Sequence, residues 1–399
     1  MPHEARLLIY LGFVPSLAIG FIYTDLSYFL TKVQGLTDFW MGTTIMVMGI
    51  TLVAASIPLG ILADRYGRRK MLILGNLCAS LSLIGFALTT NLALVMVVAV
   101  LEGIGEAAFA VSGSALLADK AGDEKRTAAY SLSGFLSWIA GALGAFAISS
   151  VLLLQTFGLS NELAHVALYV AIGLLNLSVT PAVFLIHETP PKARGEKGKG
   201  LLPRRSGRVL VKFGVYSVMI AVGAGLFVPL MAKWFYYAYG ATDAISGPVL
   251  GASSLLTSVA VLMAPRLAAK FGLVRAIVLS QGLSTFFMVL VPSSPGFGVA
   301  SLVYTVRVFL MNLSNPLGQS MVMGLVAPDE RGAASGINAS LWRLPNSLST
   351  AVGAGMMGAG MLALPFYIAT VLYVAAISVY WFLFRGAKLP EEVRAPGGQ

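Results

Sequence analysis

The chain has 399 residues, of which 57% are hydrophobic and only 11% are charged, and its formal net charge is +10. Soluble domains contain about 25% charged residues, so this composition would leave large apolar patches in water. The apolar residues form runs of about 20 or more, the length of a helix that crosses a bilayer. The composition therefore predicts a helical integral membrane protein, because a spanning helix satisfies its own backbone hydrogen bonds.

The predicted elements are twelve apolar segments in two groups of six. The first group covers residues 7–30, 39–63, 71–90, 93–118, 127–154 and 163–186. The second group covers residues 213–237, 245–268, 274–292, 297–325, 332–358 and 363–384. We predict an all-α fold of two six-helix bundles at 1–187 and 213–385, with a linker at 188–212 and a tail at 386–399. The linker is too polar to cross a bilayer, because lysine and arginine interrupt its glycine and proline.

The loop cations occupy alternate connections between the segments. One side carries Arg65, Arg68, Arg69, Lys70, Lys120, Lys125, Arg126, Arg266, Lys270, Arg275 and Arg331, whereas the other side carries essentially Lys32. The positive-inside rule then predicts cytoplasmic termini and a cytoplasmic linker in a protein integral to the cytoplasmic membrane. This topology explains the net charge without a nucleic-acid partner and predicts attraction to anionic membrane lipid.

The sequence does not indicate an enzyme. Cys78 is the single cysteine, which excludes an intrachain disulfide and a cysteine-based metal site. The histidines His3, His165 and His187 are expected at segment ends or at the terminus, and no phosphate-binding glycine loop is present. We therefore expect neither a cofactor nor a metal site.

Two segments, one in each half of the chain, resemble each other. Gly60 to Lys70 reads GILADRYGRRK and Pro265 to Arg275 reads PRLAAKFGLVR. The offset between their glycines is 272 − 67 = 205 residues, and the same offset carries Arg126 onto Arg331 and Gly20 onto Gly225. The chain is therefore interpreted as a duplicated six-helix unit. Parallel halves of this kind place a substrate site near the midplane between them, opened by rocking.

The first copy of this segment resembles the loop signature of the major facilitator superfamily. It lies between the second and third segments, as in that family, and the resemblance extends to the twelve-segment pattern of the whole chain. Two further patterns, at Leu101–Glu106 and Gly141–Gly144, only partly match those of drug/proton antiporters. The resemblance implies a secondary transporter with a small-molecule substrate, and we expect it to be a monomer.

In that family the loop forms a gate latch, whose aspartate docks against the second half on the cytoplasmic side when the carrier faces outward. The resemblance assigns that role to Asp64 and pairs Arg68 or Arg69 with Asp119. The gating residues are thus Gly60, Asp64, Arg65, Gly67, Arg68, Arg69 and Asp119, with the glycines allowing a tight turn and close helix approach. The alternative is that the arginines are orientation signals only, which leaves the glycines and Asp64 without a role.

Acidic residues inside the apolar segments are candidate proton carriers. Glu102 and Glu106 are four residues apart, so they share one helix face near mid-depth. Two neighbouring carboxylates in a low dielectric disfavour double ionisation, which favours proton binding. A structural hydrogen bond to a neighbouring helix is the alternative. Asp25, in the outer part of the first segment, is a weaker candidate that alternatively reaches the outer water.

The second half supplies cations at Lys233, Arg307 and Arg343. The offset carries Glu102 onto 102 + 205 = 307, so Glu102 and Arg307 are expected at equivalent depths and could pair across a central cavity. If they do not pair, Arg307 and Arg343 are candidates for binding an anionic substrate. A purely structural arginine bonded to carbonyls is the third reading.

Polar and aromatic residues complete the candidate substrate site. Asn312, Asn315 and Gln319 surround Pro316, which predicts a broken tenth helix of the kind that binds substrates. Trp138 and Trp342 could line the cavity, although packing or lipid-facing roles are equally compatible with the sequence.

Three functions are compatible with these features. The leading hypothesis is a proton-coupled exporter of amphipathic compounds. The second is a proton-coupled carrier of an organic anion, and the third is a non-transporting receptor, scramblase or assembly factor. The membrane acids and the Asp64 loop argue against the third, because a protein that does not cycle has little need of them.

The latch assignment predicts that Asp64→Asn slows cycling but leaves folding and ligand binding intact, because Asp64 stabilises one gate state and not the substrate site. Transport in proteoliposomes and ligand binding to the purified protein measure the two effects. Equal transport rates for the variant and the wild type would reject the latch.

Overall fold

A computed structural model describes residues 2–121, 126–187, 206–326 and 331–386, and helices are the regular secondary structure of these residues. The first bundle contains α1 (His3–Leu11), α2 (Phe13–Tyr28), the π-helix η1 (Phe29–Val33), α3 (Asp38–Tyr66), α4 (Arg68–Leu88), α5 (Leu92–Ala121), α6 (Arg126–Ala147), α7 (Ser150–Thr156), α8 (Asn161–Ser178) and α9 (Thr180–Val183). The second contains α10 (Gly207–Gly225), the 3₁₀-helix η2 (Val228–Leu230), α11 (Met231–Tyr239), α12 (Asp243–Phe271), α13 (Leu273–Leu290), α14 (Phe297–Leu325), α15 (Arg331–Gly358) and α16 (Leu364–Phe384).

Eleven helical segments of the described chain are long and apolar enough to cross a membrane. Each corresponds to a predicted segment, and the remaining predicted segment, 332–358, forms α15. α15 carries Asn338, Arg343 and Asn346 within its length, and it packs between α3 and α10. The predicted all-α membrane fold is therefore confirmed.

Two local predictions were wrong. The tenth helix is not broken at Pro316: α14 is continuous from Phe297 to Leu325 with the proline inside it. A proline removes one backbone hydrogen bond, and neighbouring helices can support the helix through that gap. The seventh helix begins at Gly207, inside the segment expected to be linker, so its first turns carry Arg208 and Lys212. Residues 188–205 of the linker and 387–399 of the tail lie outside the described residues.

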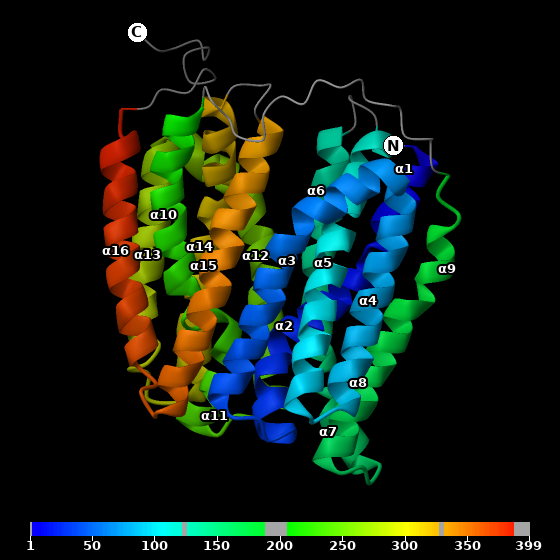
Figure 1. The fold of residues 1–399 in the computed structure, drawn as a ribbon. Helices are drawn as coiled ribbons and strands as arrows, with labels where there is room; N and C mark the ends of the chain where they lie inside the picture. Colours follow the sequence, from blue (N-terminus) through cyan, green and yellow to red (C-terminus); the bar gives the residue numbers. More distant parts are fainter. Residues whose placement is uncertain (1, 122–125, 188–205, 327–330, 387–399) are drawn as a thin grey trace.

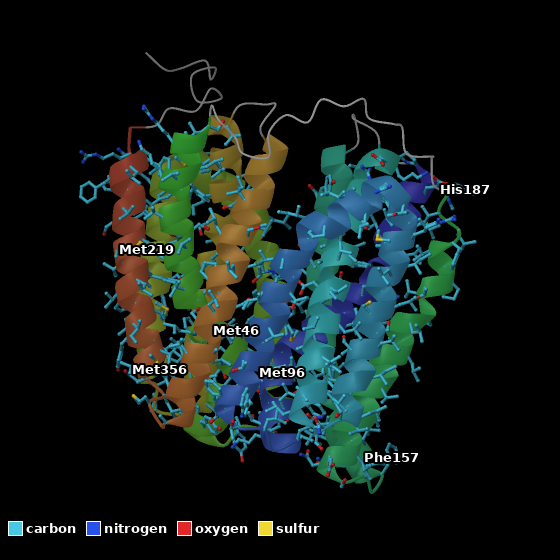
Figure 2. All side chains as sticks on the ribbon, in the orientation of Figure 1. Met46, Met96, Phe157, His187, Met219 and Met356 are labelled. Carbon is cyan, nitrogen blue, oxygen red and sulfur yellow. The ribbon has the colours of Figure 1, made fainter. Side chains whose placement is uncertain are left out.

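The two bundles stand side by side, and α1 begins at the same end at which α16 ends (Figure 1). We call this the terminal end and the opposite end the far end. His187 lies at the terminal end and Phe157 at the far end (Figure 2). The α3–α4 and α12–α13 connections, which carry the repeated segment, lie at the terminal end. They turn at Gly67 with φ 110° and at Gly272 with φ 77°, where an L side chain would be strained.

The duplication is visible in the packing of the helices. A Cβ on Gly20 of α2 would overlap the backbone of Gly141 of α6, and one on Gly225 of α10 would overlap the backbone of Asn346 of α15. The offsets agree, since 20 + 205 = 225 and 141 + 205 = 346. The same helix pair therefore crosses closely at the same level of each bundle.

The contacts identified between the bundles run from the far end to mid-depth. α6 packs on α12, where Gly247 approaches the carbonyl of Ala145 and Gly251 that of Ala142. α3 packs on α15, where Gly42 lies against Ala354. Because glycine lacks a side chain, these helices approach each other closely, as small-residue interfaces do in membranes. The far end is thus the closed end of the interface.

This packing predicts that Gly251→Ala opens the far end. The new Cβ would lie 2.9 Å from the Ala142 carbonyl oxygen, and overpacking of this kind costs about 1 to 3 kcal/mol. Alkylation of a Ser246→Cys reporter, buried on α12, by a membrane-impermeant reagent in a Cys78→Ala background should therefore accelerate. Gly282→Ala on α13, where a Cβ meets open space, is the matched control. Equal alkylation of both variants would contradict the packing argument.

Candidate functional site

An ion pair joins the two bundles at mid-depth. Arg343 of α15 contacts Glu106 of α5, with 2.5 Å between Nη2 and Oε1. Tyr23 of α2 donates its hydroxyl hydrogen to Oε2 of Glu106 at 2.6 Å and accepts a hydrogen bond from Nη1 of Arg343 at 2.9 Å. The guanidinium also lies over the Tyr23 ring, 5.6 Å from its centroid. Three side chains from three helices thus form a closed set of polar contacts.

The position of this ion pair makes it sensitive to its surroundings. Glu106 lies fourteen residues into α5, about 21 Å from the far end of a helix that rises 1.5 Å per residue. Its side chain is 9% exposed, whereas that of Arg343 is 38% exposed. The carboxylate is therefore largely shielded from water, while the guanidinium borders open space. A partner of this kind is needed because an isolated charge at mid-membrane is costly.

Glu102 lies one turn closer to the far end and bonds within its own bundle. Its carboxylate accepts a hydrogen bond from Ser82 of α4 and is buried. A void of about 10 Å³ touches both Glu102 and Glu106, together with Asn76 and Asn176. A void of this size holds about one water molecule, and the four polar groups could satisfy it. The two glutamates thus share a small polar space.

A larger cavity of about 290 Å³ lies inside the first bundle, toward the terminal end. Polar groups on its wall include Ser16, Tyr130, Ser133 and Ser137. Asn76 and Phe109 line both this cavity and the small void, so the two spaces are adjacent. The acids therefore lie beside a space that extends toward the terminal end.

Glu102 and Arg307 do not pair, so the first of the three readings of Arg307 was wrong. Arg307 of α14 is buried in the second bundle, where Nη2 donates to the Tyr373 hydroxyl at 3.0 Å. Its guanidinium also lies over the rings of Phe227 and Tyr373, at 4.9 and 5.7 Å. The repeat offset correctly gave equivalent positions, but equivalent positions both face the interior of their own bundle. The residue that faces the acids is Arg343.

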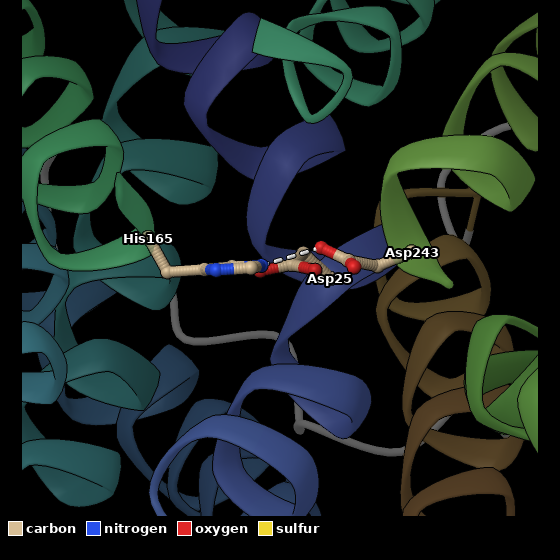
Figure 3. Close-up of side chains that lie close together, drawn as sticks. All are labelled: Asp25, His165 and Asp243. Carbon is tan, nitrogen blue, oxygen red and sulfur yellow. Dashed lines mark hydrogen bonds and ion pairs between the residues drawn. The ribbon is translucent and has the colours of Figure 1, made fainter. Parts of the chain in front are cut away.

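Two further polar groups close the far end. Lys233 of α11 is fully buried and pairs with Asp38 of α3, which also accepts a hydrogen bond from Tyr237 at 2.9 Å. Asp25 of α2, His165 of α8 and Asp243 of α12 form the second group, with 2.6 Å between His165 Nε2 and Asp243 Oδ2 (Figure 3). Both groups join the bundles, because α11 and α12 belong to the second.

Asp25 does not reach the outer water as the alternative reading proposed, since its side chain is fully buried. Sequence reasoning missed its neighbours His165 and Asp243, whose ligand atoms lie within 4.8 Å of those of Asp25. The sequence did contain a signal for this cluster. Because successive segments run in opposite directions across the membrane, the end of the first segment and the starts of the sixth and eighth lie at the same end of the protein. All three residues occupy those positions.

The other candidate binding residues are more dispersed. Asn312 donates to the Val308 carbonyl at 2.8 Å and accepts from Asn315 at 2.8 Å, so both serve α14 itself, while Gln319 is exposed. Trp138 is exposed one turn before Ala142, at the edge of the α6–α12 contact, and Trp342 is exposed beside Arg343. Trp342 is therefore the sequence neighbour of Arg343, and Trp138 lies on α6, which packs on α12 at the interface.

The loop residues adopt part of the arrangement implied by the resemblance. Arg68 forms an ion pair with Asp119, and Arg69 donates to the Ile186 carbonyl at 3.1 Å. Arg65 lies over the Tyr66 ring, and a Cβ on Gly60 would lie 3.4 Å from Val111 of α5. The side chain of Asp64 lies outside the described residues, so its gating role stays a prediction.

Comparison with known proteins identifies similar sequences and folds. Residues 8–215 match the family model of the Major Facilitator Superfamily. An uncharacterized MFS-type transporter of Bacillus subtilis (strain 168), YqjV, is 30% identical over 107 residues, which are 27% of this chain and 26% of that protein. The aligned region thus spans about a quarter of that relative.

Solved structures resemble the whole fold. The nucleoside transporter NupG superposes with a TM-score of 0.77 at 14% identity, covering 95% of this chain and 99% of NupG. A bacterial homolog of the human lysosomal transporter Spinster, described as inward-facing and occupied, superposes with a TM-score of 0.78 at 13% identity and covers 96% of each chain. At these identities the likeness concerns the fold alone.

The mid-depth ion pair predicts energetic coupling between Glu106 and Arg343. In a double-mutant cycle with Glu106→Gln and Arg343→Met, the loss of stability in the double variant should be smaller than the sum of the single losses by roughly 0.5 to 3 kcal/mol. Glu102→Gln with Arg307→Met is the matched control and should be additive, because these side chains contact different partners. Thermal or denaturant unfolding in detergent measures both cycles. Coupling in the Glu102/Arg307 cycle, with additivity in the Glu106/Arg343 cycle, would instead support a pair between Glu102 and Arg307.

Proposed function

Because the chain belongs to the Major Facilitator Superfamily, we propose that it is a proton-coupled transporter that exports amphipathic compounds through a site between its two bundles. The family match covers more than half of the chain, and eleven helical segments of the described residues are long and apolar enough to cross a membrane. The chain is therefore a secondary transporter and not an enzyme. The coupling ion, the direction and the substrate class are the proposed parts.

The observation that carries proton coupling is the Tyr23–Glu106–Arg343 set. A proton on Glu106 would cancel the carboxylate charge that holds Arg343, and so weaken a contact between the bundles. A ligand can shift a conformational equilibrium only by binding the two states unequally, and a proton at this position meets that condition. Proton binding would therefore favour separation of the bundles at the far end.

The spaces around the acids supply a route for the proton. The cavity of about 290 Å³ reaches from the terminal end to Asn76 and Phe109, and the small void continues to Glu102 and Glu106. With cytoplasmic termini, as the loop cations predict, this route would connect the acids to the cytoplasm while the far end is closed. Proton release to the cytoplasm would then re-form the ion pair.

The charge of the site favours a neutral or cationic amphipathic substrate over an organic anion. All three cations on which the anion hypothesis rested have partners: Arg343 pairs with Glu106, Lys233 with Asp38, and Arg307 lies against Tyr373 and Phe227. At Arg343 or Lys233 an anion would have to displace a carboxylate, and Arg307 is buried inside the second bundle. The exposed Trp138 and Trp342 offer apolar and aromatic surface instead.

Export rests on the partial resemblance of the fourth and fifth predicted segments, which form α5 and α6, to drug/proton antiporters. The names of the solved relatives do not decide the substrate, since nucleoside transport is a property of NupG and the likeness extends to fold only. A thermal-shift screen with cationic dyes, nucleosides and organic acids would distinguish the classes, because a bound ligand stabilises by mass action.

Proton coupling predicts that Glu102→Gln or Glu106→Gln abolishes transport driven by a pH gradient but retains exchange that needs no energy, because glutamine mimics a permanently protonated side chain. Uptake of a cationic dye into proteoliposomes, with and without a gradient, separates the two activities. Glu162→Gln, a change to an exposed carboxylate at the far end, is the control for charge removal. Full gradient-driven uptake by both single variants and by the double variant would exclude these acids as carriers.

A further inference from the structure

We propose that Asp25, His165 and Asp243 form a binding site for one divalent transition-metal ion of the Zn²⁺ type, which links the two bundles at the far end. One ligand atom from each residue lies within 4.8 Å of those from the other two. The three come from α2 and α8 of the first bundle and α12 of the second, and they converge on one point (Figure 3). The proposal does not depend on proton coupling.

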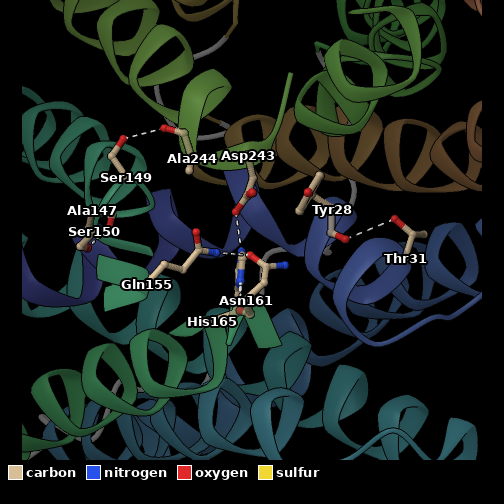
Figure 4. Close-up of polar contacts among 10 residues, drawn as sticks. All are labelled: Tyr28, Thr31, Ala147, Ser149, Ser150, Gln155, Asn161, His165, Asp243 and Ala244. Atoms are coloured by element: carbon tan, nitrogen blue, oxygen red, sulfur yellow. Dashed lines mark hydrogen bonds and ion pairs between the residues drawn. The ribbon is translucent and has the colours of Figure 1, made fainter. Parts of the chain in front are cut away.

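The hydrogen bonds of His165 show which of its nitrogens can bind a cation. Nδ1 lies 2.7 Å from the carbonyl oxygen of Asn161, which can only accept, so Nδ1 carries a hydrogen (Figure 4). In the neutral ring, Nε2 then presents a lone pair toward the carboxylate of Asp243 at 2.6 Å. Two lone pairs facing each other require either a proton or a metal ion between them. A backbone carbonyl on the second nitrogen is also the usual support of a metal-binding histidine.

Asp25 supplies the second, independent observation. Its side chain is fully buried, and neither carboxylate oxygen has a hydrogen-bond partner. The Tyr169 hydroxyl, one turn along α8 from His165, is buried and interacts with the Asp25 carboxylate. Buried carboxylates are normally paired or bound to a metal. With a neutral imidazole, the two carboxylates carry two negative charges, which one divalent ion would neutralise.

The donor set and its dimensions fit a transition metal. Imidazole nitrogen and carboxylate oxygen bind Zn²⁺ at about 2.0 to 2.2 Å, which places neighbouring ligand atoms roughly 3 to 4 Å apart. Asp25 would approach slightly and the His165–Asp243 contact would lengthen. Three protein ligands leave a fourth position for water or Tyr169. Mg²⁺ and Ca²⁺ are disfavoured, because they prefer oxygen ligands alone.

The position of the site gives the ion a defined effect. Asp243 moves with the second bundle, so the three ligands can meet only while the far end is closed. The His165 ring is fully buried and stacks on the rings of Tyr28 and Phe29, with centroid distances of 6.2 and 6.1 Å. A bound ion would therefore hold the far end closed and slow the conformational cycle.

The test uses the purified full-length protein without a polyhistidine tag, titrated with Co²⁺ and followed by visible absorption and calorimetry. Wild type should bind one Co²⁺ per chain, which Zn²⁺ displaces and Mg²⁺ does not. Asp25→Asn, His165→Gln and Asp243→Asn should each lose more than the roughly 10- to 100-fold in affinity that an outer partner contributes. His187→Asn, which removes the exposed imidazole beside Glu4, is the matched control and should bind normally.

A second measurement tests the link between the bundles in a folded protein that keeps all three wild-type ligand residues. Zn²⁺ should slow alkylation of the Ser246→Cys reporter. The same reporter protein carrying Asp25→Asn, with His187 unchanged, should show no effect of Zn²⁺. Metal-free thermal unfolding verifies that each variant is folded. The proposal is overturned if wild type takes up no metal saturably at millimolar concentration, if binding is lost with His187→Asn instead, or if Zn²⁺ leaves the alkylation rate unchanged.

Discussion

A charged side chain in the hydrocarbon region needs a partner, and this requirement determines how the two bundles meet. Two carboxylates of the first bundle find cationic partners on the second, Glu106 on Arg343 and Asp38 on Lys233, and His165 contacts Asp243 across the same interface. These contacts lie between the far end and mid-depth. Separating the bundles there would leave several charges unpaired at once, unless water, protons or a substrate compensates them. The state of the interface and the protonation of its acids are thus linked by one energetic constraint.

The close helix approaches make this constraint effective. Gly42, Gly247 and Gly251 bring the backbones of the two bundles together, so that short side chains such as Asp38 and Asp243 can reach across. With bulkier residues at these positions, the charged groups would be held apart and solvated. Packing and electrostatics therefore favour the same closed far end, which makes the closed and open arrangements distinct states. Alternating access in this superfamily depends on such a pair of states.

Sequence reasoning predicted the helices well and the contacts partly. Hydropathy locates a spanning segment, since bilayer thickness sets its length, and Gly67 and Gly272 marked turns that need a positive φ. The repeat offset gave the depth of Arg307 but not its direction, so it suggested the wrong partner for Glu102. Pro316 suggested a break that the neighbours of α14 prevent. His165 was discounted because it lies near a helix end, although three helix ends meet there. Depth is readable from one sequence, whereas the facing direction of a side chain depends on how whole helices rotate against each other.

The close helix crossing that the two bundles share differs in one respect, and the difference bears on mechanics. In the first bundle Gly20 meets Gly141, so two smooth backbone surfaces lie against each other. In the second, the equivalent of Gly141 is Asn346, whose amide donates to the Ala221 carbonyl of α10 at 3.2 Å and fastens the two helices together. The α2–α6 crossing is fastened in another way, because the Ser16 hydroxyl of α2 donates to the Ser137 hydroxyl of α6 at 3.0 Å, one turn from Gly141. Both crossings then resist sliding, so we expect each of these helix pairs to move as one body during the cycle.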